Sequence, residues 1–241
     1  YGGILTLKQG LAESVNSISA YLMKQFGPQA LIEVAHKMGI TSDLPAVPSI
    51  CLGTADFSVY EMVGAYSAFA NKGVWTEPSY ITHIEDKNGN ILQEFVPRKV
   101  EAISEETAYL MLNLMQGVVQ FGTGARLRGQ YKFNNPIAGK TGTTQNQSDG
   151  WFMGITPDLV SGAWAGCEDR SIHFRTTQLG QGANTALPIW GLYMKKVYAD
   201  PNLNYSKSDF EKPEKPLGVE LDCKQYKKPA EQQNGGTDFG I

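Results

Sequence analysis

The sequence predicts an α+β fold in which a central antiparallel sheet is sandwiched between helices. Apolar residues recur at helical spacing in the first third of the chain. The pair Asn88-Gly89 lies between two runs of β-type residues, which is typical of a tight hairpin. Segments between residues 137 and 167 are apolar on both alternating faces. A strand of that kind must be covered on both sides, so we expect helices above and below the sheet.

Three stretches have the spacing of amphipathic helices. The expected stripes consist of Leu31, Val34, Ala35 and Met38, then Met62, Ala65, Tyr66 and Phe69, and later Ile189, Tyr193 and Val197. Pro28 suits the first turn of the first helix and Gly39 suits its end. The last helix is expected over Leu187–Tyr198, where it would cover one face of the sheet.

The remaining elements follow from capping and turn residues. The hairpin strands are expected at residues 80–84 and 91–96. Ser104 predicts the cap of a further helix that Gly122 terminates. Trp151 and Trp164 lie in the apolar strand region, and we expect them in the core.

The composition divides the chain into two parts. Residues 1–200 are predicted to form one folded unit. After Asp200 the sequence turns to Lys, Glu, Pro, Gln and Gly, which predicts an extended or mobile, solvated tail over residues 201–241. The chain begins at Tyr1 rather than Met, and we expect a piece of a longer protein that is truncated on its N-terminal side.

Charge and cysteine content exclude several classes of protein. The 241 residues contain 21 Lys and Arg against 24 Asp and Glu, a balance that argues against nucleic-acid binding. No apolar run approaches the roughly 20 residues of a membrane helix. The three cysteines have no metal-ligand spacing, so we expect neither a metal nor a cofactor. Cys167 and Cys223 could pair in an oxidising envelope, although nothing in the sequence places them together.

The most distinctive segment covers residues 138–145 and contains Lys140-Thr141-Gly142. A phosphate-binding loop would need an earlier glycine where this chain has Asn134, and a helix directly afterwards. We interpret the segment instead as an edge strand along a cleft, where an ammonium, hydroxyls and backbone N–H groups meet an acidic extended peptide. Gly142 would remove the side chain where the ligand approaches the backbone. A solvated lysine in a loop is the alternative.

The second segment of interest is Ser14-Val15-Asn16. In an uninterrupted helix, the side chains of Ser14 and Asn16 would lie about 200° apart and could not serve one site. They could share a site only if the helix breaks between them into a short connector. The alternative is a capping or surface hydroxyl at Ser14 and a surface amide at Asn16.

Together the two segments resemble the second and third motifs of the penicillin-binding protein and serine β-lactamase superfamily. The wider pattern is similar to the transpeptidase domain of class A, bifunctional penicillin-binding proteins, and it holds in order and spacing from about Leu5 to Tyr198. The residues that carry it, besides the two motifs, are Leu5-Thr6-Leu7-Lys8, Glu61-Met62, Ala65-Tyr66, Phe69-Ala70-Asn71, Gly122-Thr123-Gly124, Asp149-Gly150-Trp151-Phe152 and Ala186-Leu187-Pro188-Ile189-Trp190. The fold that this implies is the β-lactamase/transpeptidase-like α+β fold.

The resemblance implies a catalytic role for three residues. Ser14 would relay a proton to or from the leaving amine. Asn16 would hold the substrate amide and the lysine of the family's first motif. Lys140 would be a fixed positive charge that faces Ser14 and attracts the peptide carboxylate.

It also implies how substrate binds. Thr141 and Thr143 would donate hydrogen bonds to the carboxylate, beside Gly142, and the Thr143 N–H would form half of an oxyanion hole. The implied reaction is peptidoglycan cross-linking: attack on a D-Ala-D-Ala stem peptide, release of D-Ala and transfer to an amine of a neighbouring strand. β-Lactam antibiotics would act as acylating mimics of the stem peptide.

One motif of the family is missing. No serine in the 241 residues is followed three positions later by lysine, so the S-x-x-K nucleophile motif is absent. The resemblance places that motif upstream, with a glycosyltransferase domain before it and the only membrane association there too. We therefore expect this chain alone to be inactive and the longer protein to work in the cell envelope, on the extracytoplasmic face of the membrane. A D,D-carboxypeptidase or β-lactamase of the same fold, or a non-catalytic binding module, are the alternatives.

Overall fold

A three-stranded antiparallel sheet organises the structure, a computed structural model that describes residues 4–222. Its strands are β5 (Ala138–Thr143), β6 (Asp149–Ile155) and β7 (Val160–Gly166), in the order β5-β6-β7. Lys140 pairs with Met153, and Trp151 pairs with Trp164. Within these residues β5 is therefore an edge strand, as the sequence predicts.

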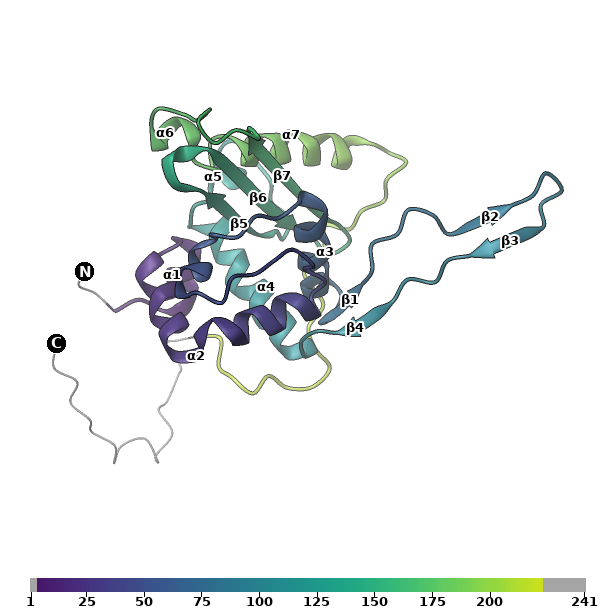
Figure 1. Cartoon of the computed structure of the whole chain (residues 1–241), viewed down its shortest axis with the longest axis horizontal. Helices are drawn as coiled ribbons and strands as arrows, with labels where there is room; N and C mark the ends of the chain where they lie inside the picture. The colour runs from purple at the N-terminus through teal and green to yellow at the C-terminus, as the bar shows by residue number, and fades with distance from the viewer. Residues whose placement is uncertain (1–3, 223–241) are drawn as a thin grey trace.

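Helices cover both faces of this sheet, which confirms the predicted sandwich (Figure 1). On one face, a Cβ added to Gly154 would collide with Trp190 of α7 (Ala186–Ala199). On the other, a Cβ on Gly162 would meet Val63 of α3 (Val59–Ala70). α4 (Glu105–Gln120) packs along β5. These glycines let two large helical surfaces approach the strands directly.

The predicted face of α7 is wrong for two of its three residues. Ile189 and Tyr193 are 52% and 47% exposed, whereas Val197 is buried as predicted, together with Leu187, Trp190 and Met194. The helix carries apolar residues on most of its circumference, so its periodicity alone does not select one face. The indole of Trp190 decides it, since it packs against Phe152 with ring centroids 5.2 Å apart, over the space left by Gly154.

The helix predicted between Pro28 and Gly39 is present, but only part of its predicted face is buried. α1 covers Leu7–Ala12 and α2 covers Asn16–Lys37. α2 bends at Gly27, which has a φ of 75°, and its second half begins at Pro28. Leu31 and Val34 are exposed, contrary to prediction. Met38 is buried as predicted, together with Ile32, in the cluster that contains Trp75.

Short elements connect the helices. They are the 3₁₀ helices η1 (Pro48–Leu52) and η2 (Gln145–Gln147), the strands β1 (Val74–Thr76) and β4 (Lys99–Glu101), and the helices α5 (Arg126–Gly129) and α6 (Thr177–Gly180). β1 and β4 pair with each other. The Ser58 and Ser104 side chains cap α3 and α4, and the cap at Ser104 is the one the sequence predicts.

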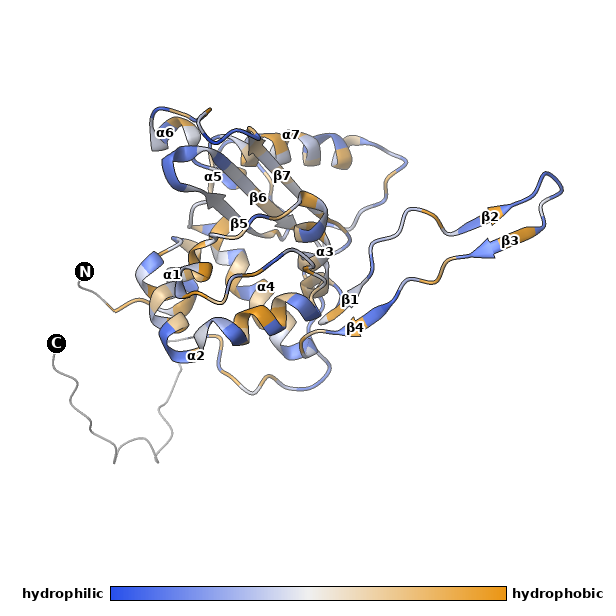
Figure 2. Ribbon diagram, in the orientation of Figure 1, coloured by the Kyte–Doolittle hydropathy of each residue, from blue (hydrophilic) through white to orange (hydrophobic). Residues whose placement is uncertain are grey.

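The predicted hairpin forms an arm that extends from the body of the molecule (Figure 1). β2 (His83–Glu85) pairs with β3 (Ile91–Glu94), and Gly89 in the turn has a φ of 82°. Both strands are shorter than predicted and exposed along their whole length. Figure 2 shows hydrophobic residues on both strands of this arm.

Two further expectations need correction. Trp164 is 37% exposed, and Trp151 is half-buried. The C-terminal segment is extended through residue 222, as predicted, but it is not merely solvated, because Phe210 is only 7% exposed and packs in the cluster that contains Leu112 and Met115. Residues 223–241 lie outside the described part of the chain.

Candidate active site

Ser14 lies in a sharp break between α1 and α2. The first helix ends at Ala12 and the second begins at Asn16. Ser14 has a φ of 56°, in the left-handed region that serine rarely adopts, and its N–H donates to the Leu11 carbonyl oxygen at 3.1 Å. This turn takes Ser14 out of both helices. The break that the sequence requires for a shared site is therefore present.

Lys140 reaches this break from the edge strand. Its Nζ donates hydrogen bonds to Ser14 Oγ at 2.7 Å and to the Thr141 carbonyl oxygen at 2.9 Å. The two residues are 126 positions apart in the sequence. The expected meeting of a hydroxyl from the helix break with an ammonium from the edge strand is thus found.

Burial weakens the hold of Lys140 on its proton. Burial lowers the pKa of Lys140 from 10.5 to about 8. Near neutral pH an ammonium with this pKa exchanges readily between its charged and neutral forms. Lys140 is therefore mostly charged at neutral pH, but it releases its proton more easily than an exposed lysine does.

Asn16 lies two residues beyond Ser14, as the first residue of α2. Its side chain is exposed, and within residues 4–222 it has no hydrogen-bond partner. The amide therefore lies at the start of α2, directly after the connector that holds Ser14, with its donor and acceptor available to groups outside these residues.

The two threonines of β5 each contact a second segment of the chain. Thr141 Oγ1 lies 2.7 Å from Thr123 Oγ1, in the loop after α4. Thr143 Oγ1 accepts a hydrogen bond of 3.0 Å from the N–H of Gly182, just before α7. The strand that bears Lys140 thus lies between two loops that contact its hydroxyls.

The structure gives a reason for a residue without a side chain at position 142 that the sequence does not reveal. It pairs with Trp151, and a Cβ added to Gly142 would lie 3.0 Å from the Cβ of that tryptophan. The missing side chain therefore makes room for the neighbouring strand, and its role toward a ligand stays a prediction.

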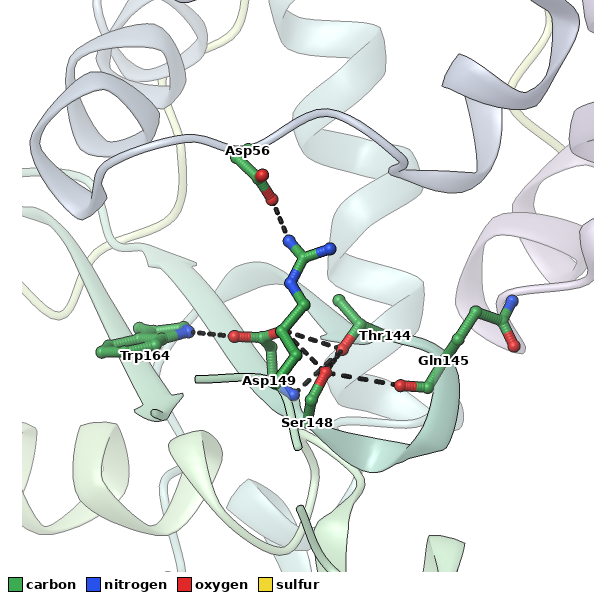
Figure 3. A network of polar contacts seen from close by, with 7 residues as sticks. Asp56, Thr144, Gln145, Ser148, Asp149 and Trp164 are labelled. Carbon is green, nitrogen blue, oxygen red and sulfur yellow. Dashed lines mark hydrogen bonds and ion pairs between the residues drawn. The ribbon is translucent and has the colours of Figure 1, made fainter. Parts of the chain in front are cut away.

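A buried carboxylate fixes the turn that follows β5. Figure 3 shows Asp149 between Trp164 on one side and Thr144 and Ser148 on the other. Its Oδ1 accepts from Trp164 Nε1 at 2.9 Å, and its Oδ2 accepts from the two hydroxyls at 2.9 and 3.0 Å. Burial favours a raised pKa, but these hydrogen bonds hold the pKa of Asp149 below its usual value. The charged group ties the end of β5 to β6 and β7.

Sequence reasoning missed three of these contributors. Thr123 and Asp149 belong to segments quoted for the family resemblance, but no role was assigned to them. Gly182 was not singled out at all. The available signals are a threonine between two glycines and an aspartate at the start of a strand, and both become meaningful only through contacts with distant residues.

Residues 4–222 contain no disulfide, no cluster of metal ligands and no membrane-spanning helix. Within residues 4–222, Cys51 and Cys167 form no disulfide. Cys223, the expected partner of Cys167, lies outside these residues. No cluster of three metal-ligating side chains occurs in this range. Nor does any helix within it combine the length and apolarity that a membrane crossing requires.

Comparison with known proteins identifies relatives over most of the chain. The family described as penicillin binding protein transpeptidase domain matches residues 1–163. Penicillin-binding protein 1A of Aquifex aeolicus is 34% identical over 227 residues, which cover 93% of this chain and 29% of the relative. The protein of the same name from Neisseria meningitidis serogroup A is 34% identical over 203 residues, covering 81% of this chain and 25% of the relative. The chain thus spans less than a third of these relatives.

Solved structures agree. Penicillin-binding protein 1A from Haemophilus influenzae is similar with a TM-score of 0.74 and 26% identity, over 86% of this chain and 36% of the other. Penicillin-binding protein PonA1 from Mycobacterium tuberculosis gives a TM-score of 0.75 and 25% identity, over 91% of this chain and 62% of the other. The expected fold and the expected likeness to class A proteins are confirmed. The chain belongs to the penicillin-binding protein transpeptidase domain family.

Proposed function

We propose that this chain is the C-terminal portion of a serine-type D-Ala-D-Ala transpeptidase domain that cross-links peptidoglycan. Residues 1–200 form the domain portion in this proposal, and residues 201–241 follow it in the sequence. The observation that carries the proposal is the 2.7 Å hydrogen bond from Lys140 Nζ to Ser14 Oγ, which links the helix break to the edge strand. A hydroxyl beside an ammonium with a pKa of about 8 suits proton transfer near neutral pH.

The proposed first step is acylation of a serine that this chain does not contain. The serine oxygen attacks the carbonyl carbon of the penultimate D-Ala, and the bond to the terminal D-Ala nitrogen breaks. The attacking serine gives up its proton through the lysine of the missing motif to Ser14, and Ser14 delivers a proton to the leaving amine, while Lys140 stabilises the Ser14 oxygen during the relay. Asn16 holds the substrate amide and the lysine of the missing motif.

The edge strand binds the substrate's terminal carboxylate in this scheme. The Thr141 and Thr143 hydroxyls donate to it, beside Gly142, and the charged form of Lys140 attracts it. The N–H of Thr143 stabilises the developing oxyanion together with the N–H of the nucleophile. An amine of a neighbouring stem peptide then attacks the acyl-enzyme and completes the cross-link. β-Lactams acylate the same serine.

The partners and location follow from this function. The chain requires the preceding part of the same protein for its S-x-x-K motif, and a glycosyltransferase domain and membrane anchor belong to that part. Its substrates are peptidoglycan stem peptides, so it works on the extracytoplasmic face of the membrane. Support comes from the absence of S-x-x-K in the 241 residues and from relatives more than three times as long.

Labelling with a fluorescent penicillin tests the proposal. The longest reading frame that contains this chain should be labelled covalently, whereas the 241-residue chain alone should not. In the long form, Lys140→Ala should slow labelling at least about 100-fold, because it removes the group that supports proton transfer. Lys87→Ala, at the exposed tip of the hairpin arm, is the matched control and should label normally.

Two results would contradict this scheme. Undiminished labelling of Lys140→Ala would remove Lys140 from the mechanism. A covalent adduct on Ser14 would make it the nucleophile rather than the relay. Product analysis with a D-Ala-D-Ala peptide and an acceptor amine distinguishes cross-linking from hydrolysis, the product expected of a carboxypeptidase.

A further inference from the structure

We propose that Thr123 is a positioning residue that sets the Thr141 hydroxyl as a hydrogen-bond donor for the substrate carboxylate. The inference rests on the proposed function and adds a determinant of specificity from a loop that the mechanism above does not use. Thr123 lies in the loop between α4 and α5, 18 residues before Thr141, and their Oγ1 atoms are 2.7 Å apart.

The loop is fixed to the helix that leads into Ser14. The N–H of Thr123 donates to the Ala12 carbonyl oxygen at 3.0 Å. Next to it, a Cβ on Gly122 would collide with that same carbonyl group, so only glycine permits this approach. Thr123 therefore joins the end of α1, two residues before Ser14, to the edge strand that carries Lys140.

The hydrogen-bond directions on β5 follow from the chemistry of hydroxyls. Each hydroxyl donates one proton and accepts at its lone pairs, whereas a carboxylate only accepts. Thr143 Oγ1 already accepts from the N–H of Gly182 at 3.0 Å, which leaves its own proton available. When the Thr123 hydroxyl donates to Thr141 Oγ1, the Thr141 hydroxyl also keeps its own proton available for a ligand.

Two hydroxyls on the strand that carries Lys140 then each keep a proton for a ligand, which suits an anionic, acceptor-only group. The Gly182 contact comes from the backbone and cannot be removed by substitution. The Thr123 contact comes from a side chain, and the half-buried Thr123 can be changed without altering the strand itself. Thr123 thus offers a way to perturb carboxylate recognition separately from Lys140.

The test compares acylation of the longest reading frame by benzylpenicillin and by its methyl ester, which lacks the carboxylate. The preference is the ratio of the two second-order rate constants. Thr123→Val keeps the shape but removes the hydroxyl, and should reduce the preference for the acid about tenfold, the effect of one hydrogen bond to a charged group. Thr123→Ser keeps the hydroxyl and should retain the preference.

Thr156→Val is the matched control. It also removes a hydroxyl, one that bonds to Leu159 at the opposite end of the β5–β6 pair, and should leave the preference unchanged. Equal slowing of Thr123→Val toward acid and ester, or no change, would overturn the role of Thr123. An unsubstituted protein that neither probe acylates would instead refute the proposed function itself, which separates the two failures.

Discussion

Lys140 is the group whose charge we expect to change most within an accessible pH range. Burial lowers its pKa from 10.5 to about 8. At pH 7 about one molecule in ten then has a neutral Lys140, against fewer than about one in a thousand for an unshifted lysine. The folded chain binds this proton more weakly than the unfolded chain, so stability should rise with pH between about 8 and 10.5. Below that range, burial of the ammonium costs about 3 kcal/mol.

Trace acetylation measures this pKa directly, because only neutral amines react. The chain is treated with a small amount of acetic anhydride at a series of pH values, and the modification of each lysine is measured by mass spectrometry. Lys140 should give a midpoint near 8, with the exposed Lys87 as the internal comparison. Ser14→Ala removes an acceptor 2.7 Å from the ammonium, which destabilises its charged form and should lower the midpoint further.

The assay needs no catalytic activity, so it is independent of the missing nucleophile. A Lys140 midpoint near 10.5 would show that the ammonium is well solvated and would refute the argument from burial. An upward shift in Ser14→Ala would show that the hydroxyl does not stabilise the charged form.

Two further predictions concern the scaffold. Hydrogen bonds from Ser42, Ser58 and Thr41 outweigh burial and lower the pKa of Glu61 from 4.5 to about 2. Glu61→Gln should therefore lower the free energy of unfolding by about 1–2 kcal/mol at neutral pH, measured by denaturant unfolding. That deficit should shrink as pH falls from 4.5 toward 2, and a pH-independent deficit, or an equal one in the exposed Glu94→Gln, would contradict the linkage. Phe210→Ala empties a buried site, so it should lower the free energy of unfolding by about 3 kcal/mol and make residues 200–222 sensitive to protease. Phe26→Ala, at an exposed position, should do neither. Protease resistance of Phe210→Ala would show that other contacts hold the segment.

Local signals in the sequence predicted most of the elements. Ser104 caps α4, Pro28 restarts α2 after Gly27, and the Asn88-Gly89 turn joins β2 to β3. Each of these depends on a backbone conformation or a hydrogen bond within a few residues. Such preferences act in the same way wherever the segment lies, so the sequence alone reveals them.

The choice of buried face could not be predicted in the same way. In α7, Ile189 and Trp190 are adjacent in the sequence and both apolar, and only the space above Gly154 determines which of the two faces the sheet. In α2, Leu31 and Ile32 present the same ambiguity. Where a helix is apolar around most of its surface, the complementary shape of its partner selects the contact face.

The candidate site shows the same division. From the sequence alone came the condition that Ser14 and Asn16 share a site only where the helix breaks, and the prediction that Lys140 lies on an edge strand, because helix geometry and side-chain alternation depend on local spacing. The tertiary structure alone decided that Ser14 and Lys140 lie 2.7 Å apart, that Thr123 contacts Thr141, and that the Lys140 pKa falls to about 8. Contacts and desolvation are made by residues distant in the chain, and local sequence carries no record of which distant groups will surround a side chain.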